Sequence, residues 1–250
     1  MEINDLVIII MAGGLGKRME SDIPKVLHLV AGLPMIVCVL NQAIKLNPRK
    51  ILIVVGKYRL SIEQTVMAHI SDLSRIEFVD QTEALGTGHA ILCCKSILET
   101  NYLSSTVLIL SGDVPLLQAE TMTDMITNIS KIKIMVTTLN NPYGYGRIIE
   151  KNDQFDKITE EKDCTPEEKT IKKINCGIYA FDSKILCKYL SSIRNNNAST
   201  EYYLTDIIEI IKQNENIPIS MYEIPNHKQI EIHGVNTKKQ LEELTGQLPH

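Results

Sequence analysis

The first half of the chain alternates between two patterns of apolar residues. Short, mostly apolar runs are typical of strands that are buried on both faces of a parallel sheet, and segments with apolar residues at helical spacing lie between them. Strands that alternate with helices predict a doubly wound, mostly parallel, Rossmann-like α/β sheet covered on both faces. The predicted strands are 6–10, 51–55, 76–79, 107–110 and 134–138, and the predicted helices are 34–46, 60–70, 87–98 and 120–129.

The pattern changes near residue 140. Turn residues and charges dominate from 140 to 163, and short apolar pairs among them predict an antiparallel ribbon. We found no repeat of fixed period and no low-complexity linker, so we expect one domain, 1–250, with a core (about 1–139), an inserted lobe with returning core elements (about 140–236) and a C-terminal helix and tail (237–250). The further predicted elements are strands at 174–181 and 219–224 and helices at 183–191, 203–214 and 237–244.

Composition excludes several classes of protein. Hydrophobic residues make up 44% and charged residues 22%, as in soluble globular proteins, and the net charge of −4 gives no sign of a nucleic-acid surface. No apolar stretch is long enough to span a membrane, and the charges at Glu2 and Asp5 do not fit a signal peptide. The six cysteines include no C-x-x-C pair, which favours reduced thiols over a zinc site or a disulfide framework. We therefore expect a cytoplasmic protein with neither nucleic acid nor membrane as a partner.

The stretch MAGGLGKRMESDIPK at 11–25 follows the first predicted strand. A glycine-rich turn after a strand can point several backbone N–H groups at one spot, which is how proteins cradle phosphate oxygens. A Walker A loop is excluded because Arg18 follows Gly16-Lys17, and the dinucleotide fingerprint is excluded because Met19 replaces its third glycine. Our interpretation is a nucleoside triphosphate site, and the alternative is an ordinary turn with incidental cations. The glycines and cations are Gly13, Gly14, Gly16, Lys17, Arg18 and Lys25.

An acid is expected to face this loop. In doubly wound sheets the first and fourth strands are commonly neighbours, and ligands bind at the carboxyl ends of strands where the order reverses. Asp113 follows the fourth predicted strand behind the flexible Gly112, a common way to present a Mg²⁺ ligand beside phosphates. The alternative is a turn aspartate before Pro115.

A third candidate segment is QTEALGTGHA at 81–90. Gly86 precedes Thr87 at a predicted helix start, so Thr87 is a possible cap and the backbone there can approach a ligand closely. Gln81 carries a donor and an acceptor, which suits the edge of a nucleobase. A plain helix-capping loop is equally compatible with the residues. We interpret His89 as structural rather than as a general base.

The second lobe offers weaker candidates. Gly144 and Gly146 would let the backbone approach a ligand, Glu160 and Asn175 could bind sugar hydroxyls, and Asn236 could add a neutral oxygen ligand to a metal. Each residue taken singly fits ordinary turn or surface chemistry.

Nine segments nevertheless occur together and in order: MAGGLGKRM, IPKVLH, QTEALGTGHA, GDVPL, GYGRI, ITEEKD, INCGI, NNNASTEYYLTDII and GVN. In this the chain resembles the sugar-phosphate nucleotidylyltransferases, most closely the uridylyltransferase domain of bacterial bifunctional uridylyltransferase/acetyltransferases. The resemblance runs from about residue 7 to about residue 244. It implies a nucleotide-diphospho-sugar transferase-like fold whose inserted lobe binds the sugar.

The resemblance also implies a reaction and a set of sites. UTP and N-acetylglucosamine 1-phosphate would be the substrates and partners, and in-line attack on the α-phosphate would give UDP-N-acetylglucosamine and pyrophosphate. Arg18 and Lys25 would be catalytic, and Mg²⁺ would be held by Asp113 and Asn236. The nucleotide would lie on Met11, Ala12, Gly13, Gly14, Gly16, Gln81, Gly86 and Thr87. The sugar would lie on Gly146, Glu160, Asn175 and Tyr202, with Tyr203 as an alternative to Tyr202.

The chain departs from the family pattern at three places. Relatives usually have Thr at the position of Lys17, commonly have a basic residue at that of Leu15, and often have an aromatic residue at that of Ser111. The sequence shows no hexapeptide repeat of a left-handed β-helix. We therefore expect no acetyltransferase activity and a monomer or small homo-oligomer.

Two alternatives stay open. The same chemistry could act on another sugar 1-phosphate, such as glucose 1-phosphate, or on another nucleotide. A non-catalytic subunit that binds nucleotide sugars is the second alternative.

Overall fold

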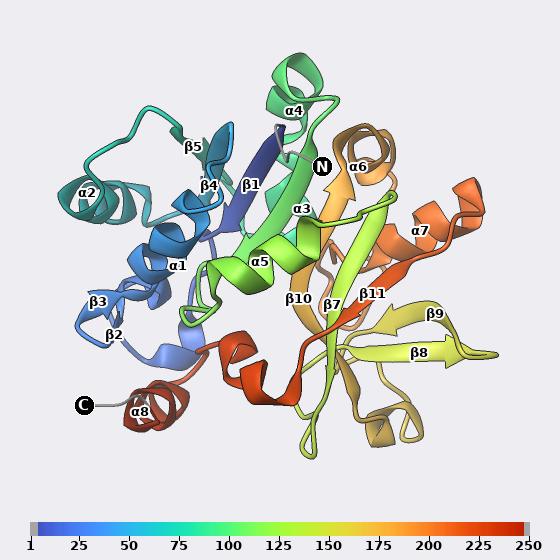
Figure 1. Cartoon of the computed structure of the whole chain (residues 1–250). Coiled ribbons are helices and arrows are strands. Elements are labelled where there is room, and N and C mark those ends of the chain that lie inside the picture. Colours follow the sequence, from blue (N-terminus) through green and yellow to red (C-terminus); the bar gives the residue numbers. More distant parts are fainter. Residues whose placement is uncertain (1–4, 248–250) are drawn as a thin grey trace.

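The structure is a computed structural model that describes residues 5–247. Strand β1 (Leu6–Met11) pairs in parallel with β6 (Thr106–Ser111) on one side and β4 (Lys50–Val55) on the other. β5 (Ile76–Asp80) continues the parallel sheet beyond β4 (Figure 1). The predicted first and fourth strands are thus neighbours, and the doubly wound, mostly parallel arrangement is confirmed.

The other half of the sheet is mixed. β10 (Lys173–Asp182) runs antiparallel between β6 and β7 (Ile132–Thr138), and β11 (Ser220–Glu223) closes this edge parallel to β7. β8 (Arg147–Lys151) pairs with β10 and, antiparallel, with β9 (Gln154–Thr159). The predicted antiparallel ribbon is therefore present, and it is joined to the main sheet through β10.

Helices cover both faces of the sheet because the side chains of each buried strand alternate between them. From β1, Leu6, Ile8 and Ile10 pack in one hydrophobic cluster, and Val7 and Ile9 pack in another. The first cluster lies under α1 (Met35–Ile44), α2 (Arg59–His69) and α5 (Ala119–Ile126), and the second under α3 (Thr87–Leu92), α4 (Lys95–Asn101), α6 (Ser183–Leu190) and α7 (Asp206–Glu215).

Two predicted helices differ from the observed ones. The helix expected over 87–98 is divided into α3 and α4 at Cys93 and Cys94, where the Cys94 N–H bonds to the carbonyl of Ile91, three residues back, in a tightened turn. The helix expected over 120–129 ends at Ile126, and Asn128 has a left-handed backbone with φ of 53°. The pattern located both helical segments but neither the break in the first nor the end of the second.

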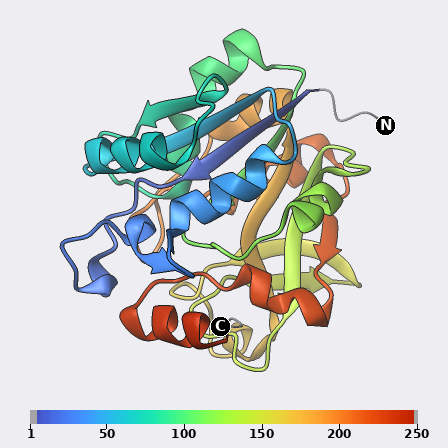
Figure 2. The same cartoon turned by 60° about the vertical axis from the view of Figure 1, so that its left-hand side comes forward.

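The C-terminal helix α8 (Lys238–Gly246) packs beside a hairpin from the N-terminal third of the chain (Figure 2). The hairpin consists of β2 (Leu29–Val30) and β3 (Leu33–Pro34), and Val30 shares a cluster with Leu244 of α8. The short 3₁₀ helices are Lys17–Met19, Lys25–Leu27, Glu168–Thr170 and Asn226–Ile232.

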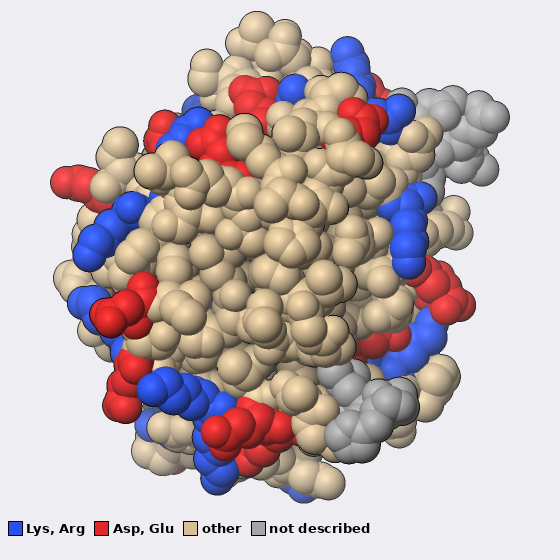
Figure 3. All heavy atoms as spheres, turned by 90° about the vertical axis from the view of Figure 1, so that its left-hand side faces the viewer, with Lys and Arg blue, Asp and Glu red and all other residues tan. Residues whose placement is uncertain are grey.

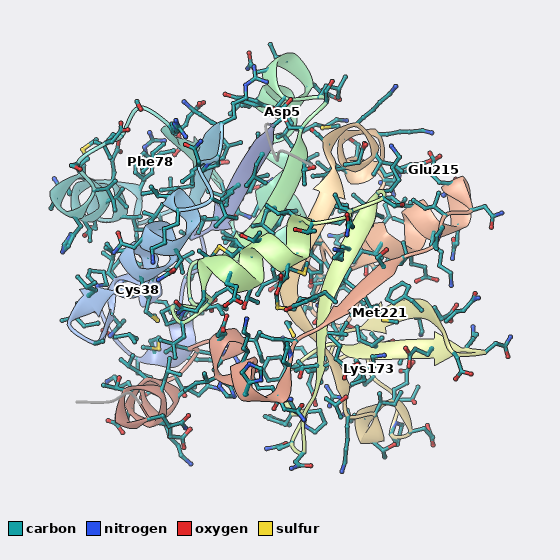
Figure 4. The ribbon with its side chains drawn as sticks, in the orientation of Figure 1. Asp5, Cys38, Phe78, Lys173, Glu215 and Met221 are labelled. Carbon is teal, nitrogen blue, oxygen red and sulfur yellow. The ribbon has the colours of Figure 1, made fainter. Side chains whose placement is uncertain are left out.

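One face of the molecule carries few charged side chains near its centre (Figure 3). On the face that carries α2 and the hairpin, charged side chains lie mostly around the edge (Figure 3). All six cysteines are unpaired thiols, and Cys38 lies on α1 (Figure 4). No helix within residues 5–247 has the length and apolarity needed to cross a membrane.

Candidate functional site

The glycine loop leaves β1 at the carboxyl edge of the sheet. None of the N–H groups of residues 13–16 donates a hydrogen bond to another described residue, so these donors are available to a ligand. Gly16 has φ of 61°, and a Cβ there would lie 2.8 Å from Cβ of Lys25. Glycine is thus required at this position both for the turn and for the close approach of Lys25. The loop thus combines a tight turn with N–H donors that have no partner among the described residues.

Lys25 lies between the two predicted metal ligands. Its ammonium contacts the carboxylate of Asp113 and donates to Oδ1 of Asn236 at 3.1 Å. Nη2 of Arg18 donates to the same Asn236 oxygen at 3.0 Å. The fold therefore brings together four residues that are separated by up to 218 positions in the sequence.

Backbone contacts fix this cluster. The Gly112 N–H donates to the carbonyl of Met11 at 2.9 Å, and the Val235 N–H donates to the carbonyl of Asp113 at the same distance. The Asn236 N–H donates to Oε1 of Gln240 in α8 at 2.8 Å. Asp113 and Asn236 are consequently held in register with each other and with the end of β1.

Ser111 orients the carboxylate of Asp113. Its hydroxyl donates to Oδ1 at 2.6 Å, which leaves Oδ2 facing Lys25. Burial alone would raise the pKa of Asp113, but the ammonium of Lys25 and the hydroxyl of Ser111 together lower it below its ordinary value. The site therefore keeps a buried carboxylate ionised. Sequence reasoning missed this role and treated Ser111 only as a lost aromatic residue.

The donor set suits Mg²⁺. One carboxylate oxygen and one amide oxygen already surround a cation, the ammonium of Lys25. Mg²⁺ prefers oxygen ligands and is usually held by one or two carboxylates together with waters and substrate phosphates. Within residues 5–247, no group of three or more His, Cys, Asp or Glu side chains could hold a metal ion. Asp113 and Asn236 thus fit a magnesium ion that arrives with phosphate.

The opposite wall of the site comes from the segment at 81–90. Gln81 is buried, and its Nε2 donates to the carbonyl of Gly86 at 3.1 Å and lies 3.3 Å from Nδ1 of His89. Gly13 packs against this amide, because a Cβ at Gly13 would lie 2.6 Å from Oε1 of Gln81. His89 thus contacts Gln81, consistent with the structural role expected for it.

The capping role considered for Thr87 is wrong. Gly86 occupies the N-cap position of α3 with φ of 116°, and Thr87 makes no cap hydrogen bond there. The Thr87 hydroxyl instead accepts from the Leu204 N–H at 3.0 Å. The close approach allowed by Gly86 is to Tyr202, whose carbonyl oxygen would lie 2.6 Å from a Cβ at Gly86. This loop is locked to the segment before α7.

A cavity of about 400 Å³ lies between the glycine loop and this wall. Asp113 lines it, as does the exposed Glu201, which the sequence did not predict. Its lining includes Lys25 and every residue assigned to the nucleotide: Met11, Ala12, Gly13, Gly14, Gly16, Gln81, Gly86 and Thr87.

A second cavity, of about 280 Å³, adjoins the first. It is lined by Gly146, Glu160 and Asn175 from the second lobe and shares Asp113 with the nucleotide cavity. Asn236 also lines it, whereas Tyr202 lies outside its lining and contacts the Gly86 loop. The predicted sugar residues other than Tyr202 are therefore brought together next to the predicted metal ligands.

Hydrogen bonds orient the polar groups of this second cavity. Nδ2 of Asn175 donates to the hydroxyl of Tyr179 at 2.7 Å, and its Oδ1 accepts from the Gly177 N–H at 3.2 Å. Oε1 of Glu160 accepts from the Thr205 hydroxyl at 2.9 Å. These bonds fix the rotamers, so Glu160 and Asn175 are presented to the cavity with little conformational freedom left to lose.

A buried ion pair supports the turn that carries Gly146. Arg147 is 1% exposed, and its guanidinium bonds to the Tyr145 carbonyl and lies 2.8 Å from the carboxylate of Glu161. Glu161 also accepts from the Gly144 N–H at 3.0 Å. Sequence reasoning did not identify either member of this pair.

The carboxylates near this cavity affect one another. Burial raises the pKa of Glu160, and the hydrogen bond from Thr205 opposes the shift. Burial first and the neighbouring Glu160 second raise the pKa of Asp206 from 3.8 to about 6. Asp206 begins α7, directly after Thr205.

Comparison with known proteins adds to this geometry. Residues 7–223 match the protein family described as nucleotidyl transferase. The chain is 46% identical over 242 residues to a probable UDP-N-acetylglucosamine pyrophosphorylase of Acanthamoeba polyphaga mimivirus, a match that covers 95% of this chain and 94% of the viral protein. It is 40% identical over 244 residues to the bifunctional protein GlmU of Alkaliphilus metalliredigens, covering 96% of this chain but 51% of that protein. The chain thus spans about half the length of this bacterial relative.

Solved structures with a similar fold are also found. A crystal structure of UDP-glucose pyrophosphorylase complexed with UDP-glucose superposes with a TM-score of 0.75 at 17% sequence identity, covering 97% of each chain. At this identity the likeness shows a shared fold.

Gly86 and Gly14 should respond differently to the same substitution. Gly86→Ala would strain a residue with φ of 116° and place Cβ 2.6 Å from the Tyr202 carbonyl, so we expect a loss of about 2 kcal/mol or more in the free energy of unfolding. Gly14→Ala meets open space and should change it by less than about 0.5 kcal/mol. Urea unfolding of both variants measures the difference, and equal losses would contradict the packing described for Gly86.

Asp206 should make stability depend on pH. Because its pKa is raised from 3.8 to about 6, the folded state binds this proton more tightly than the unfolded chain, and stability falls as pH rises through that window. Relative to wild type, the free energy of unfolding of Asp206→Asn should increase by about 1 kcal/mol between pH 4 and pH 7, after allowance for solvent screening. Thermal unfolding of both proteins across this pH range measures the difference. Glu242→Gln, at an exposed acid of α8 with no ion pair to a described residue, is the control, and a parallel trend in both variants would disprove the assignment.

Proposed function

Because the chain belongs to the nucleotidyl transferase family, we propose that it joins UTP to N-acetylglucosamine 1-phosphate, giving UDP-N-acetylglucosamine and pyrophosphate. The observation that carries the proposal is the meeting of the two cavities at Asp113. One cavity has a phosphate-type glycine loop, the other has polar groups suited to sugar hydroxyls, and the bond to be made would lie where they join. The name of the viral relative supports the choice of sugar and nucleotide.

The residues of the chain would act mainly by positioning and by balancing charge. The phosphate of the sugar 1-phosphate is already ionised at neutral pH, so the reaction needs no general base. In-line attack on the α-phosphorus requires the two phosphates to be held together despite their repulsion. Orientation and preorganised charges provide much of the rate enhancement in transfers of this kind.

Specific groups fit each part of the triphosphate. The N–H groups of residues 13–16 would bind phosphate oxygens, Arg18 would neutralise the departing pyrophosphate, and Lys25 would stabilise the charge that accumulates at the α-phosphate. Asp113 and Asn236 would hold Mg²⁺, which when bound would neutralise further phosphate charge.

The second cavity would select the sugar. Glu160 would accept hydrogen bonds from sugar hydroxyls, and Asn175, with the backbone at Gly146, would contact the N-acetylglucosamine. The Arg147–Glu161 pair would keep the Gly144–Gly146 turn in place. Discrimination would come from polar groups that are left unpaired when a hydroxyl is missing or misplaced.

Glucose 1-phosphate is the main competing substrate, because one of the structural neighbours that superpose over nearly the whole chain is a UDP-glucose pyrophosphorylase. The test is pyrophosphate release from the pure protein with UTP, Mg²⁺ and a panel of sugar 1-phosphates. We expect kcat/KM for N-acetylglucosamine 1-phosphate to exceed that for glucose 1-phosphate by roughly tenfold or more, equivalent to about 1.4 kcal/mol. Preference for glucose 1-phosphate would replace the proposed sugar. No turnover with any member would favour a binding subunit.

Asp113→Asn should separate catalysis from folding. The amide keeps the size of the side chain but removes the negative charge near the proposed metal, so we expect kcat to fall by roughly a hundredfold or more. Circular dichroism should stay as in wild type. Asp22→Asn is the control, because Asp22 is an exposed acid of the glycine-rich segment 11–25 with no ion pair to another described residue. Wild-type turnover in Asp113→Asn would remove Asp113 from the mechanism.

A further inference from the structure

Lys25 occupies the position between the two oxygens that the proposed function assigns to the metal. Its ammonium contacts Asp113 and lies 3.1 Å from Oδ1 of Asn236, and no other cation is needed to pair with the carboxylate. The side chains of Lys25 and Asp113 are only 16% and 11% exposed. The protein therefore contains its own cation for this oxygen pair.

We propose that Lys25 acts as a specificity residue for metal entry, closing the oxygen pair to free Mg²⁺ and releasing it only when the metal arrives with the triphosphate. This inference rests on the proposed function, because that assigns Asp113 and Asn236 to Mg²⁺. It adds a second role to Lys25, which would transfer its ammonium from Asp113 to the nucleotide phosphate.

The charges at the site support this order of events. The contacting side chains are one carboxylate, Asp113, and two cations, Lys25 and Arg18, so the cluster is already net positive. A free divalent cation would have to expel an ammonium from a mostly buried ion pair and would leave it without a counter-charge. Losing the partner of a buried charge is costly. Free metal should therefore bind poorly.

A triphosphate reverses this balance. It brings several negative charges into the cavity next to the loop, where Lys25 and the N–H groups of residues 13–16 can bind them. Lys25 then exchanges one anionic partner for another, and Asp113 becomes available to the metal. Magnesium favours such sites because phosphates complete its coordination shell.

The small number of protein oxygens available to the metal also supports its arrival with the triphosphate. The pair offers one carboxylate and one neutral amide, and no cluster of three or more metal-type side chains exists within residues 5–247. One oxygen of the carboxylate is also taken by the Ser111 hydroxyl. A site this sparse depends on ligands from the substrate.

The direct test is Mn²⁺ binding without nucleotide, followed by the electron paramagnetic resonance signal of the unbound ion. Wild type should bind Mn²⁺ weakly, and Lys25→Met should bind it with an affinity roughly tenfold or more higher. Methionine keeps the Cβ that packs on Gly16 and removes the ammonium. Lys17→Met is the matched control, because Lys17 is an exposed cation of the same loop with no ion pair to a described residue, and it should bind Mn²⁺ as wild type does.

Equal binding by wild type and Lys25→Met would overturn the proposal. So would an equal gain in Lys17→Met, because that would reduce the effect to the net charge of the loop. These outcomes are distinct from failure of the proposed function. If pyrophosphate is released but Lys25→Met gains no Mn²⁺ affinity, the reaction stands and this role of Lys25 falls. If no substrate reacts but Lys25→Met gains Mn²⁺ affinity, the proposed reaction falls and the control of metal binding by Lys25 stands.

A second measurement uses the wild-type protein alone and covers the case in which Lys25→Met does not fold. Reductive methylation of Lys25, quantified by mass spectrometry, should be slow and should not change when millimolar Mg²⁺ is added, because the ammonium stays on Asp113. Faster methylation of Lys25 with Mg²⁺, at an unchanged rate for Lys17, would show that the metal displaces it without nucleotide. That result would also overturn the proposal.

Discussion

The parallel pairing of β1 with β6 is the constraint on which the site depends. Its register places Met11 opposite Ser111, so the chain leaves both strands at the same edge of the sheet. The glycine loop and Asp113 therefore start from neighbouring points, and Val235 then ties the returning chain to the carbonyl of Asp113. A shift of one residue would turn the buried side chains of β1 to the wrong faces, so core packing protects this register.

Much of the fold could be predicted because the strands are buried on both faces. Such strands appear in the sequence as continuous apolar runs, and their alternation with helices predicts the parallel half of the sheet. The glycine loop and Asp113 could be recognised from their places directly after such runs. Asn236, Glu160 and Asn175 could not be found this way, because each lies in a segment of ordinary composition, and only the ordered set of family motifs identified them.

The features that escaped prediction depend on contacts between distant segments. Thr87 had the local signature of a cap, but its hydroxyl bonds to Leu204, which lies 117 residues away. The helix around Cys94 is interrupted while that residue packs in the second core cluster, and helical periodicity carries no signal for such a break. The Arg147–Glu161 pair is likewise a tertiary contact. The family pattern alone shows Ser111 only as the replacement of an aromatic residue, yet in three dimensions its hydroxyl orients a carboxylate.

The chemistry of the two loop cations suggests a division of labour. A guanidinium is a rigid fork that forms its hydrogen bonds in fixed directions, and Arg18 already uses one of them on Asn236. An ammonium is a compact charge on a flexible stem with donors that can rotate, so Lys25 can change partners by turning about its side-chain bonds. The position between a carboxylate and a phosphate site calls for a charge that can move. Lysine meets this requirement at position 25, whereas arginine at position 18 is suited to holding a fixed partner.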